Sequence, residues 1–353
     1  MAEFFLELFS EEIPARMQRD AGAQLESLVV AFLQNFRAPG DKKRVFYGPR
    51  RIAVSVDVHE TALSDQNANP TEPARQRGPR LDAPPQALEG FLRKNNAVSD
   101  PLIRDRLVEE NGYYYLLDKS ASAPEPLAEI IQSKLAGVLA KFSWPKSMRW
   151  GQSEAFMWVR PLRRMICMLD GAVIPIDLGP VTADDKTEGH RVHAPGAFTV
   201  SGMAAWEEKL TQHYVIANPI LRREMIAQGL ADKAAGLGLR LVADEALLDE
   251  ITGLVEWPVP MIGRIDDEFM ALPPEVRELS MKVNQKYLAL RDDTGKPAPY
   301  FAFVANLEAL DGGVSIIEGN QRVLRARLSD AQYFWARDRE TPLDDALPKL
   351  ETI

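Results

Sequence analysis

The sequence predicts an α+β protein with more than one domain, and three observations support this fold class. The 353 residues are enough for roughly two or three hydrophobic cores. Segments with helical spacing of apolar residues and segments with strand-like spacing follow one another along the chain. Trp144-Pro145 then interrupts a helical pattern. We therefore expect an N-terminal α/β sandwich-like layer at 1–150 and a mixed α+β domain at 151–340.

The first domain begins with a predicted strand, helix and strand. Phe4 to Leu8 is an apolar run, and Pro14 opens a helix with apolar residues at helical spacing as far as Phe36. Residues 52–58 alternate valine or isoleucine with smaller or polar residues, which predicts a half-buried strand. Residues 64–85 are polar and rich in proline, so we expect a mobile surface loop there. The remaining predicted elements are a helix at 87–95, a strand at 113–117 and a helix at 127–142.

The second domain opens with a hairpin signal. Asp170-Gly171 separates two apolar runs, and this dipeptide accepts the positive φ angles of a tight turn. A second turn-forming segment, Asp292 to Lys296, separates two later strands. The other predicted elements are helices at 220–235 and 245–255 and strands at 239–242, 287–290 and 300–304. A helical pattern near Leu343 predicts the start of a further, truncated domain at 341–353.

Composition and charge exclude several classes of protein. With 46% hydrophobic and 26% charged residues, the composition is that of a globular protein rather than a disordered or collagen-like chain. The single cysteine, Cys167, lies in an apolar run and fits a reducing compartment. We find no signal peptide and no apolar run of membrane-spanning length, so we expect a cytoplasmic protein with no membrane partner.

The net charge of −9 argues against nucleic-acid binding through the whole surface, but local basic patches remain. The patches are 42–44 with 50–51; Arg75, Arg77 and Arg80; Arg160, Arg163 and Arg164; and 322–327. The last patch lies on a predicted helix whose buried face would carry Leu324, Leu328, Ala331 and Trp335. Arg322, Arg325 and Arg327 are then candidates for binding tRNA or a partner protein. The alternative is that these arginines pair with Asp330 and Asp338 of the same chain.

Two other segments contain candidate site residues. Thr187 to His193 includes Glu188, His190, Arg191 and His193, and an H-x-x-H pair beside a carboxylate could ligate zinc. The set lacks a fourth ligand, so we predict no metal and place these residues at the rim of a pocket. Glu256 precedes Trp257-Pro258 and is a further rim candidate, although packing is the favoured explanation for this segment. The sequence has no phosphate-binding glycine motif and no nucleophile motif, so we expect no catalytic residue.

Six segments in order along the chain are similar to those of the bacterial glycyl-tRNA synthetase beta subunit family. GNQRVLRARLSDAQYFW at 319–335 resembles the family block GNERVLRARLSDAxFFW. The chain departs from the family at Asn284, where histidine is usual, and at Leu288, where phenylalanine is usual. The other matching segments are FFLELFSEEIP at 4–14, YGPRRIAV at 47–54, TEGHRVH at 187–193, LVEWPVPMIG at 254–263 and MKVNQKYLAL at 281–290.

This resemblance implies the N-terminal part of a non-catalytic subunit of an aminoacyl-tRNA synthetase. In that family, ATP and Mg²⁺ are used by a separate alpha subunit, so no cofactor is expected in this chain. The beta subunit is expected to bind tRNA(Gly) and to assemble with the alpha subunit as an α2β2 hetero-oligomer. Residues 151–340 are expected to resemble the editing-type domain of the phenylalanyl-tRNA synthetase beta chain, retained as a scaffold. An HD-like domain and an anticodon-binding domain would follow.

Two other functions remain open from the residues alone. One is a metal-dependent hydrolase that uses Glu188, His190 and His193. The other is a purely structural interaction module whose arginines pair only with acids of the same chain. Metal analysis tests the first alternative, and the salt dependence of tRNA binding tests the second.

Overall fold

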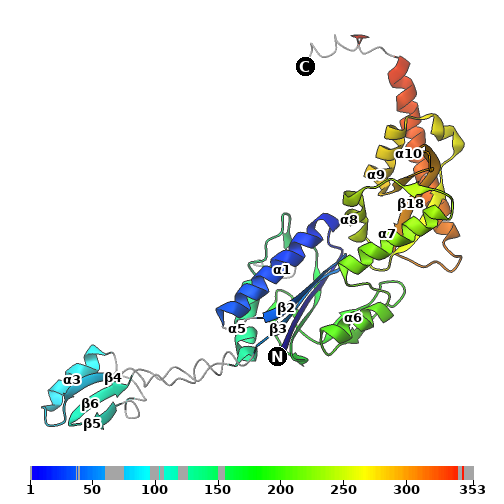
Figure 1. Ribbon diagram of the computed structural model, residues 1–353. Helices are drawn as coiled ribbons and strands as arrows, with labels where there is room; N and C mark the ends of the chain where they lie inside the picture. Colours follow the sequence, from blue (N-terminus) through cyan, green and yellow to red (C-terminus); the bar gives the residue numbers. More distant parts are fainter. Residues whose placement is uncertain are drawn as a thin grey trace.

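The computed structural model describes residues 2–36, 38, 40–59, 75–95, 103, 107–117, 126–149, 156–340 and 344–345. In these residues the largest sheet has five antiparallel strands in the order β10-β9-β1-β3-β2 (Figure 1). The strand bounds are β1 (Ala2–Ser10), β2 (Gly40–Tyr47), β3 (Arg51–Val58), β9 (Leu162–Leu169) and β10 (Ala172–Val173).

Helices cover both faces of this sheet. On one face, α1 (Ala15–Asn35) and α5 (Leu127–Leu139) pack against the even-numbered residues of β1, among them Phe4. On the other face, α6 (Met203–Gln212) packs against Phe5 through Trp206, whose ring centroid lies 5.4 Å from that of Phe5. Figure 1 shows α1 and α6 on opposite sides of the strands. The predictions of β1, α1 and α5 are confirmed, although α5 ends three residues before Phe142.

The prediction that 52–58 is half buried is wrong. Both faces of β3 are buried, including Ala53 and Ser55 on the side that was expected to meet solvent. The cause is α6, which covers this side and which the sequence analysis did not predict.

The predicted Asp-Gly hairpin is confirmed, since β9 pairs with β10 and the turn residues Asp170 and Gly171 have φ angles of 49° and 77°. β9 also pairs with β1 from Phe4 to Ser10. The domain boundary expected near residue 150 therefore divides the strands of one sheet. β3 precedes this boundary in the chain and β9 follows it, yet the two strands flank β1.

A second sheet lies in the C-terminal half and has the antiparallel order β15-β17-β18-β16 in the described residues. Its strands are β15 (Arg240–Leu241), β16 (Val259–Arg264), β17 (Leu288–Arg291) and β18 (Pro297–Ala305). One face packs against α7 (Pro219–Ala235) and α8 (Glu245–Thr252). The other packs against the 3₁₀ helix η1 (Asp267–Ala271), α9 (Pro274–Gln285) and α10 (Val314–Glu340).

The predicted helices and strands of this half are confirmed, whereas β16 and α9 were not predicted. β16 contains Pro260, a residue that argues against a strand in the middle of a sheet. Because β16 is an edge strand, its proline removes no hydrogen bond that the sheet needs.

Residues 75–95 and 107–117 form a small unit of their own. Its three antiparallel strands have the order β4-β6-β5, with β4 (Arg75–Arg80), β5 (Leu107–Glu110) and β6 (Tyr113–Leu117), and α3 (Pro85–Lys94) packs on β4. The loop predicted at 64–85 is therefore wrong for residues 75–80, which pair with β6 despite their polarity. Residues 64–74 lie outside the described residues. The predictions of α3 and β6 are confirmed.

Cys167 is buried in β9, and burial raises the pKa of its thiol to about 12, so it is a core residue as predicted. Among the described helices, none combines the length and the apolar character needed to cross a bilayer. The further domain predicted at 341–353 lies almost entirely outside the described residues. The short strands are β7 (Met148–Arg149), β8 (Met157–Trp158), β11 (Asp177–Leu178), β12 (Val181–Thr182), β13 (Lys186–Glu188) and β14 (Ala197–Thr199).

Candidate functional site: a buried ion-pair junction

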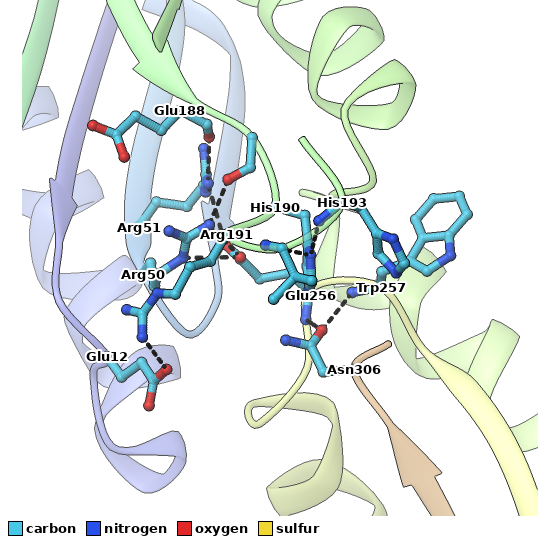
Figure 2. Close-up of polar contacts among 12 residues, drawn as sticks. Glu12, Arg50, Arg51, Glu188, His190, Arg191, His193, Glu256, Trp257 and Asn306 are labelled. Carbon is cyan, nitrogen blue, oxygen red and sulfur yellow. Dashed lines mark hydrogen bonds and ion pairs between the residues drawn. The ribbon is translucent and has the colours of Figure 1, made fainter. Parts of the chain in front are cut away.

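A buried cluster of charged side chains joins the two halves of the structure. We call it the junction cluster, and it consists of Glu7, Arg50, Arg51, Thr187 and Glu256. Glu7 lies on β1, Arg51 begins β3 and Arg50 directly precedes it, Thr187 lies on β13, and Glu256 lies between α8 and β16. Figure 2 shows Arg50, Arg51 and Glu256 together. Segments far apart in sequence therefore meet at one point.

Arg51 is the centre of the cluster and is only 2% exposed. Its Nη1 donates to Glu7 Oε1 at 3.1 Å and to Thr187 Oγ1 at 3.2 Å. Its Nη2 donates to the Glu188 carbonyl at 2.9 Å and to Glu256 Oε1 at 3.1 Å. One guanidinium thus bridges two carboxylates, as its fork of donors allows.

Arg50 holds the other oxygen of the same carboxylate. Its Nε and Nη2 both donate to Glu256 Oε2, at 2.9 and 2.6 Å, and Nη2 also donates to the Gly189 carbonyl at 2.6 Å. The guanidinium carbons of Arg50 and Arg51 lie 5.2 and 5.0 Å from the centroid of the Phe9 ring. Glu256 is therefore clamped between two arginines in a site from which water is largely excluded.

The two carboxylates in the cluster differ in their proton affinity. Burial by itself would raise the pKa of Glu256, but the charges of Arg51 and Arg50 outweigh burial and hold the pKa below 4.5. Burial raises the pKa of Glu7 above 4.5, because Arg51 and Thr187 offset it only in part. In the described residues, Oε2 of Glu7 has no partner at hydrogen-bonding distance. Glu256 is the firmly ionised partner of the two arginines.

A third buried arginine, Arg222, ties the halves together beside the cluster. Asn218 caps α7 by accepting from the backbone N–H groups of Ile220 and Leu221, and this places Arg222 on the buried side of the first turn. Arg222 donates to the backbone carbonyls of Thr252, Ile216, Ala217 and, across the junction, Tyr47. Burial lowers the pKa of its guanidinium to about 10.

The loop after β13 contains the predicted histidines, and one ring nitrogen of each is engaged with the backbone. His190 Nδ1 accepts from the backbone N–H groups of Val192 and His193. His193 Nε2 accepts from the N–H of Glu308 at 3.0 Å. Figure 2 shows the two histidines side by side in this loop. Burial lowers the pKa of His190, so this ring is neutral near pH 7. The His193 ring stacks on Tyr214 with centroids 4.7 Å apart. Both rings therefore have structural roles.

This geometry does not fit the metal-dependent hydrolase alternative. Glu188 directs its carboxylate to Arg164 Nε at 2.8 Å rather than toward His190 or His193. A metal ligand must offer a free nitrogen lone pair, and each histidine uses one of its nitrogens as an acceptor for backbone N–H groups. Over the described ranges, no three His, Cys, Asp or Glu side chains are grouped to hold a metal ion.

A polar pocket of about 330 Å³ adjoins the junction cluster. Glu188 and Arg191, two of the rim candidates, line it together with Arg50 and Arg163. Glu11 bridges Arg163 at 2.7 Å and Arg191 at 3.0 Å. Glu256 was expected at a pocket rim, but it is only 3% exposed, because two arginines enclose its carboxylate.

Comparison with known proteins agrees with the resemblance found in the sequence. The family model described as glycyl-tRNA synthetase beta subunit matches residues 4–353. The chain belongs to this family. The glycine–tRNA ligase beta subunit of Phenylobacterium zucineum is 41% identical over 100% of the chain and 51% of its own length. The beta subunit of Paracoccus denitrificans is 41% identical over 96% of the chain and 48% of its own length. The beta subunit of Rhodospirillum centenum is 37% identical over 100% of the chain and 52% of its own length. The chain spans about half the length of these relatives.

Four of the segments that resemble the glycyl-tRNA synthetase beta subunit family meet in the junction cluster. FFLELFSEEIP contributes Glu7, YGPRRIAV contributes Arg50 and Arg51, TEGHRVH contributes Thr187, and LVEWPVPMIG contributes Glu256. The sequence analysis had placed Arg50 and Arg51 in a surface patch and had assigned no role to Glu7 or Arg222. Glu7 inside an apolar strand, and Arg222 at helical spacing from the buried Ile226 and Leu230, are the signals that could have revealed them.

The predicted arginines of this family member lie on α10, as expected, but their surroundings differ from one another. Arg325 Nε donates to Asp266 Oδ2 at 2.5 Å, so its partner is neither Asp330 nor Asp338. Arg322 and Arg327 are exposed and have no ion pair with any described residue. Leu324 and Leu328 are buried as predicted, whereas Trp335 is 39% exposed, because α10 extends past the sheet that covers its first half. The prediction that Trp335 lies on a buried face is wrong.

Proposed function

We propose that the chain is the N-terminal part of the beta subunit of a cytoplasmic glycine–tRNA ligase and acts with a separate alpha subunit that uses ATP and Mg²⁺. The observation that carries this proposal is the family match over residues 4–353, with 37 to 41% identity to named beta subunits. In this proposal the chain binds tRNA(Gly) and supports an α2β2 assembly, while glycine activation occurs on the alpha subunit.

The exposed arginines of α10 support the tRNA-binding part of the proposal. Arg322 and Arg327 project from a helix that Leu324 and Leu328 anchor in the core, so their charges are held on a rigid support. A chain with a net charge of −9 attracts RNA only where positive charge is concentrated. We therefore assign Arg322 and Arg327 to phosphate contacts.

The junction cluster supports a scaffold function for residues 151–340, which we propose to be an editing-type domain without hydrolase activity. Arg50, Arg51 and Glu256 of the cluster are paired with each other and with backbone carbonyls, so none of these three groups is free to activate water. A group that acts as general base must reach the proton that it removes.

The test of tRNA binding uses the full-length beta subunit assembled with its alpha subunit. The Arg322→Ala, Arg327→Ala double variant is expected to weaken tRNA(Gly) binding and to reduce the slope of log K against log salt by about two. The matched control is Arg16→Ala, Arg19→Ala, which removes the same charge from exposed positions on α1. Equal slopes for the double variant and the wild type would contradict the α10 assignment.

The division of labour between the subunits has its own test. The purified chain alone is expected to give no glycine-dependent pyrophosphate exchange and no charged tRNA, because it has no phosphate-binding glycine motif. Addition of the alpha subunit to the full-length beta subunit is expected to restore both activities. Exchange by the chain alone, in a preparation free of alpha subunit, would refute the proposal.

A further inference from the structure

The small sheet of β4, β5 and β6 has one covered face and one open face. On the covered face, Leu116 is 2% exposed, and a Cβ added to Gly78 would meet Phe91 of α3 at 2.9 Å. Residues that pair directly across antiparallel strands lie on the same face of the sheet. Arg77 pairs with Tyr115, next to Gly78 along β4, and therefore belongs to the face opposite α3.

Two rows of side chains cross the open face. The first row is Arg77, Tyr115 and Val108, and the second row is Arg80, Tyr113 and Glu110. Arg77 and Arg80 are exposed, the two tyrosines are half buried, and Val108 is 37% exposed. Positive charge thus lies along β4, aromatic rings lie along the central strand, and Glu110 lies on the β5 side.

The guanidinium group of Arg77 lies over an aromatic ring. Its guanidinium carbon lies 3.7 Å from the centroid of the Tyr113 ring, and that of Arg80 lies 5.8 Å from the same ring. Arg80 also pairs with Asp82, whereas Arg77 has no carboxylate partner within the described ranges. Stacking covers one plane of the Arg77 guanidinium but leaves its edge donors and its outer plane available.

We propose that this open face binds RNA, with the donors of Arg77 on a backbone phosphate and an unstacked base against Arg77 and Tyr115. Positive charge beside aromatic rings on an open sheet is the arrangement with which proteins bind single-stranded RNA. The two arginines of the open face lie along β4, so the RNA backbone runs along that strand. The proposal rests on the proposed function, which supplies tRNA as the RNA, and adds a contact surface distinct from α10.

The test compares two substitutions of Arg77 in the full-length beta subunit assembled with its alpha subunit. Arg77→Met keeps an unbranched chain over the Tyr113 ring but removes the charge, whereas Arg77→Lys keeps the charge but loses the planar donor group. We expect Arg77→Met to weaken tRNA(Gly) binding by roughly 3- to 10-fold and to reduce the salt slope by about one. Arg77→Lys should keep the wild-type salt slope and regain only part of the affinity.

The matched control is Arg93→Met on α3, an exposed arginine on the far side of the sheet that pairs with Glu89. It should leave the affinity and the salt slope unchanged. Cross-linking of tRNA that contains 4-thiouridine should label the peptide 107–117 in the wild type and label it less in Arg77→Met.

Three outcomes would overturn the inference. They are wild-type tRNA affinity in Arg77→Met, an equal loss in Arg93→Met, and a loss of alpha-subunit association in place of tRNA binding. These differ from failure of the proposed function, in which the wild-type assembly itself would not attach glycine to tRNA.

Discussion

The arginines at 50–51 and those at 322–327 look alike in the sequence but occupy opposite environments. Arg50 and Arg51 are at most 6% exposed, and they donate to carboxylates, carbonyls and a threonine hydroxyl of this chain. Arg322 and Arg327 stand on the outside of α10 without an ion pair to any described residue. The same residue type therefore stabilises the fold in one place and is available to a partner in the other.

The difference lies in what happens when a partner is removed. A buried charge that loses its counter-charge has no water to replace it, and the loss of one partner costs about 3 to 5 kcal/mol. An exposed charge is solvated before and after the change, so stability hardly responds. Substitutions in the junction cluster should therefore lower stability more than substitutions on α10. Substitutions on α10 should weaken tRNA binding more than substitutions in the junction cluster.

The largest effect is expected from Glu256→Ala. This change leaves Arg50 and Arg51 buried without their shared carboxylate, and the free energy of unfolding in denaturant should fall by about 3 to 5 kcal/mol. Glu245→Ala is the matched control, because Glu245 also pairs with an arginine, Arg223, but is 78% exposed. If both variants lost the same small amount of stability, the junction cluster would not hold the two halves together.

A smaller loss, about 3 kcal/mol, is expected from Arg222→Met, which removes a donor from three buried carbonyls and the partly buried carbonyl of Tyr47. Arg222→Lys keeps a charge but cannot reach all four carbonyls from one ammonium group, so it should recover only part of the loss. Denaturant unfolding checks both variants. Wild-type stability in Arg222→Met would show that these carbonyls find other donors.

The pH dependence of stability should distinguish the two carboxylates of the junction cluster. Because the folded pKa of Glu256 is below 4.5, its contribution is present above pH 4.5 and is lost as the pH falls through the folded pKa. The folded pKa of Glu7 is above 4.5, so its ionised carboxylate lowers the stability of the folded state at higher pH. This loss of stability disappears as the pH falls toward 4.5. Glu256→Gln should flatten the acid loss of stability, whereas Glu7→Gln should leave it in place. The same acid profile in both variants would contradict these assignments.

The smallest effect concerns two neighbours on α10. Arg325 is held by Asp266, whereas Arg322 has no such partner, so Arg322→Ala should reduce the salt slope of tRNA binding by about one and Arg325→Ala by less. Thermal unfolding should be nearly the same for both variants, since both side chains are exposed. A larger slope change for Arg325→Ala would mean that the Asp266 pair opens when RNA binds.

The sequence predicted most of the helices and strands, because their spacing is a local property. It predicted β1, α1, the Asp170-Gly171 turn and the strands on either side of 292–296, all of which depend on neighbouring residues. It does not predict α6, α9, β2 or β16, and it predicts a loop at 75–80, since a strand of arginines and proline becomes visible only through its pairing with β6.

The candidate site could be predicted only in part for the same reason. The α10 arginines follow from helical spacing, and Arg322 and Arg327 lie where that spacing places them. The junction cluster depends on pairs such as Arg51 with Glu256, which are separated by 205 positions. No local pattern indicates which acid a buried arginine will meet, so Arg50 and Arg51 were taken for a surface patch.

The pairing of β1 has a consequence for how the protein is made. β1 precedes both of its partners in the chain, and β3 is synthesised soon after it, whereas β9 is synthesised much later. Until then one edge of an apolar strand is open, which is a state prone to aggregation. The ion pair of Arg51 with Glu256 can form only later, because Glu256 follows β9 in the chain. Translation therefore completes the five-stranded sheet before Arg51 can pair with Glu256.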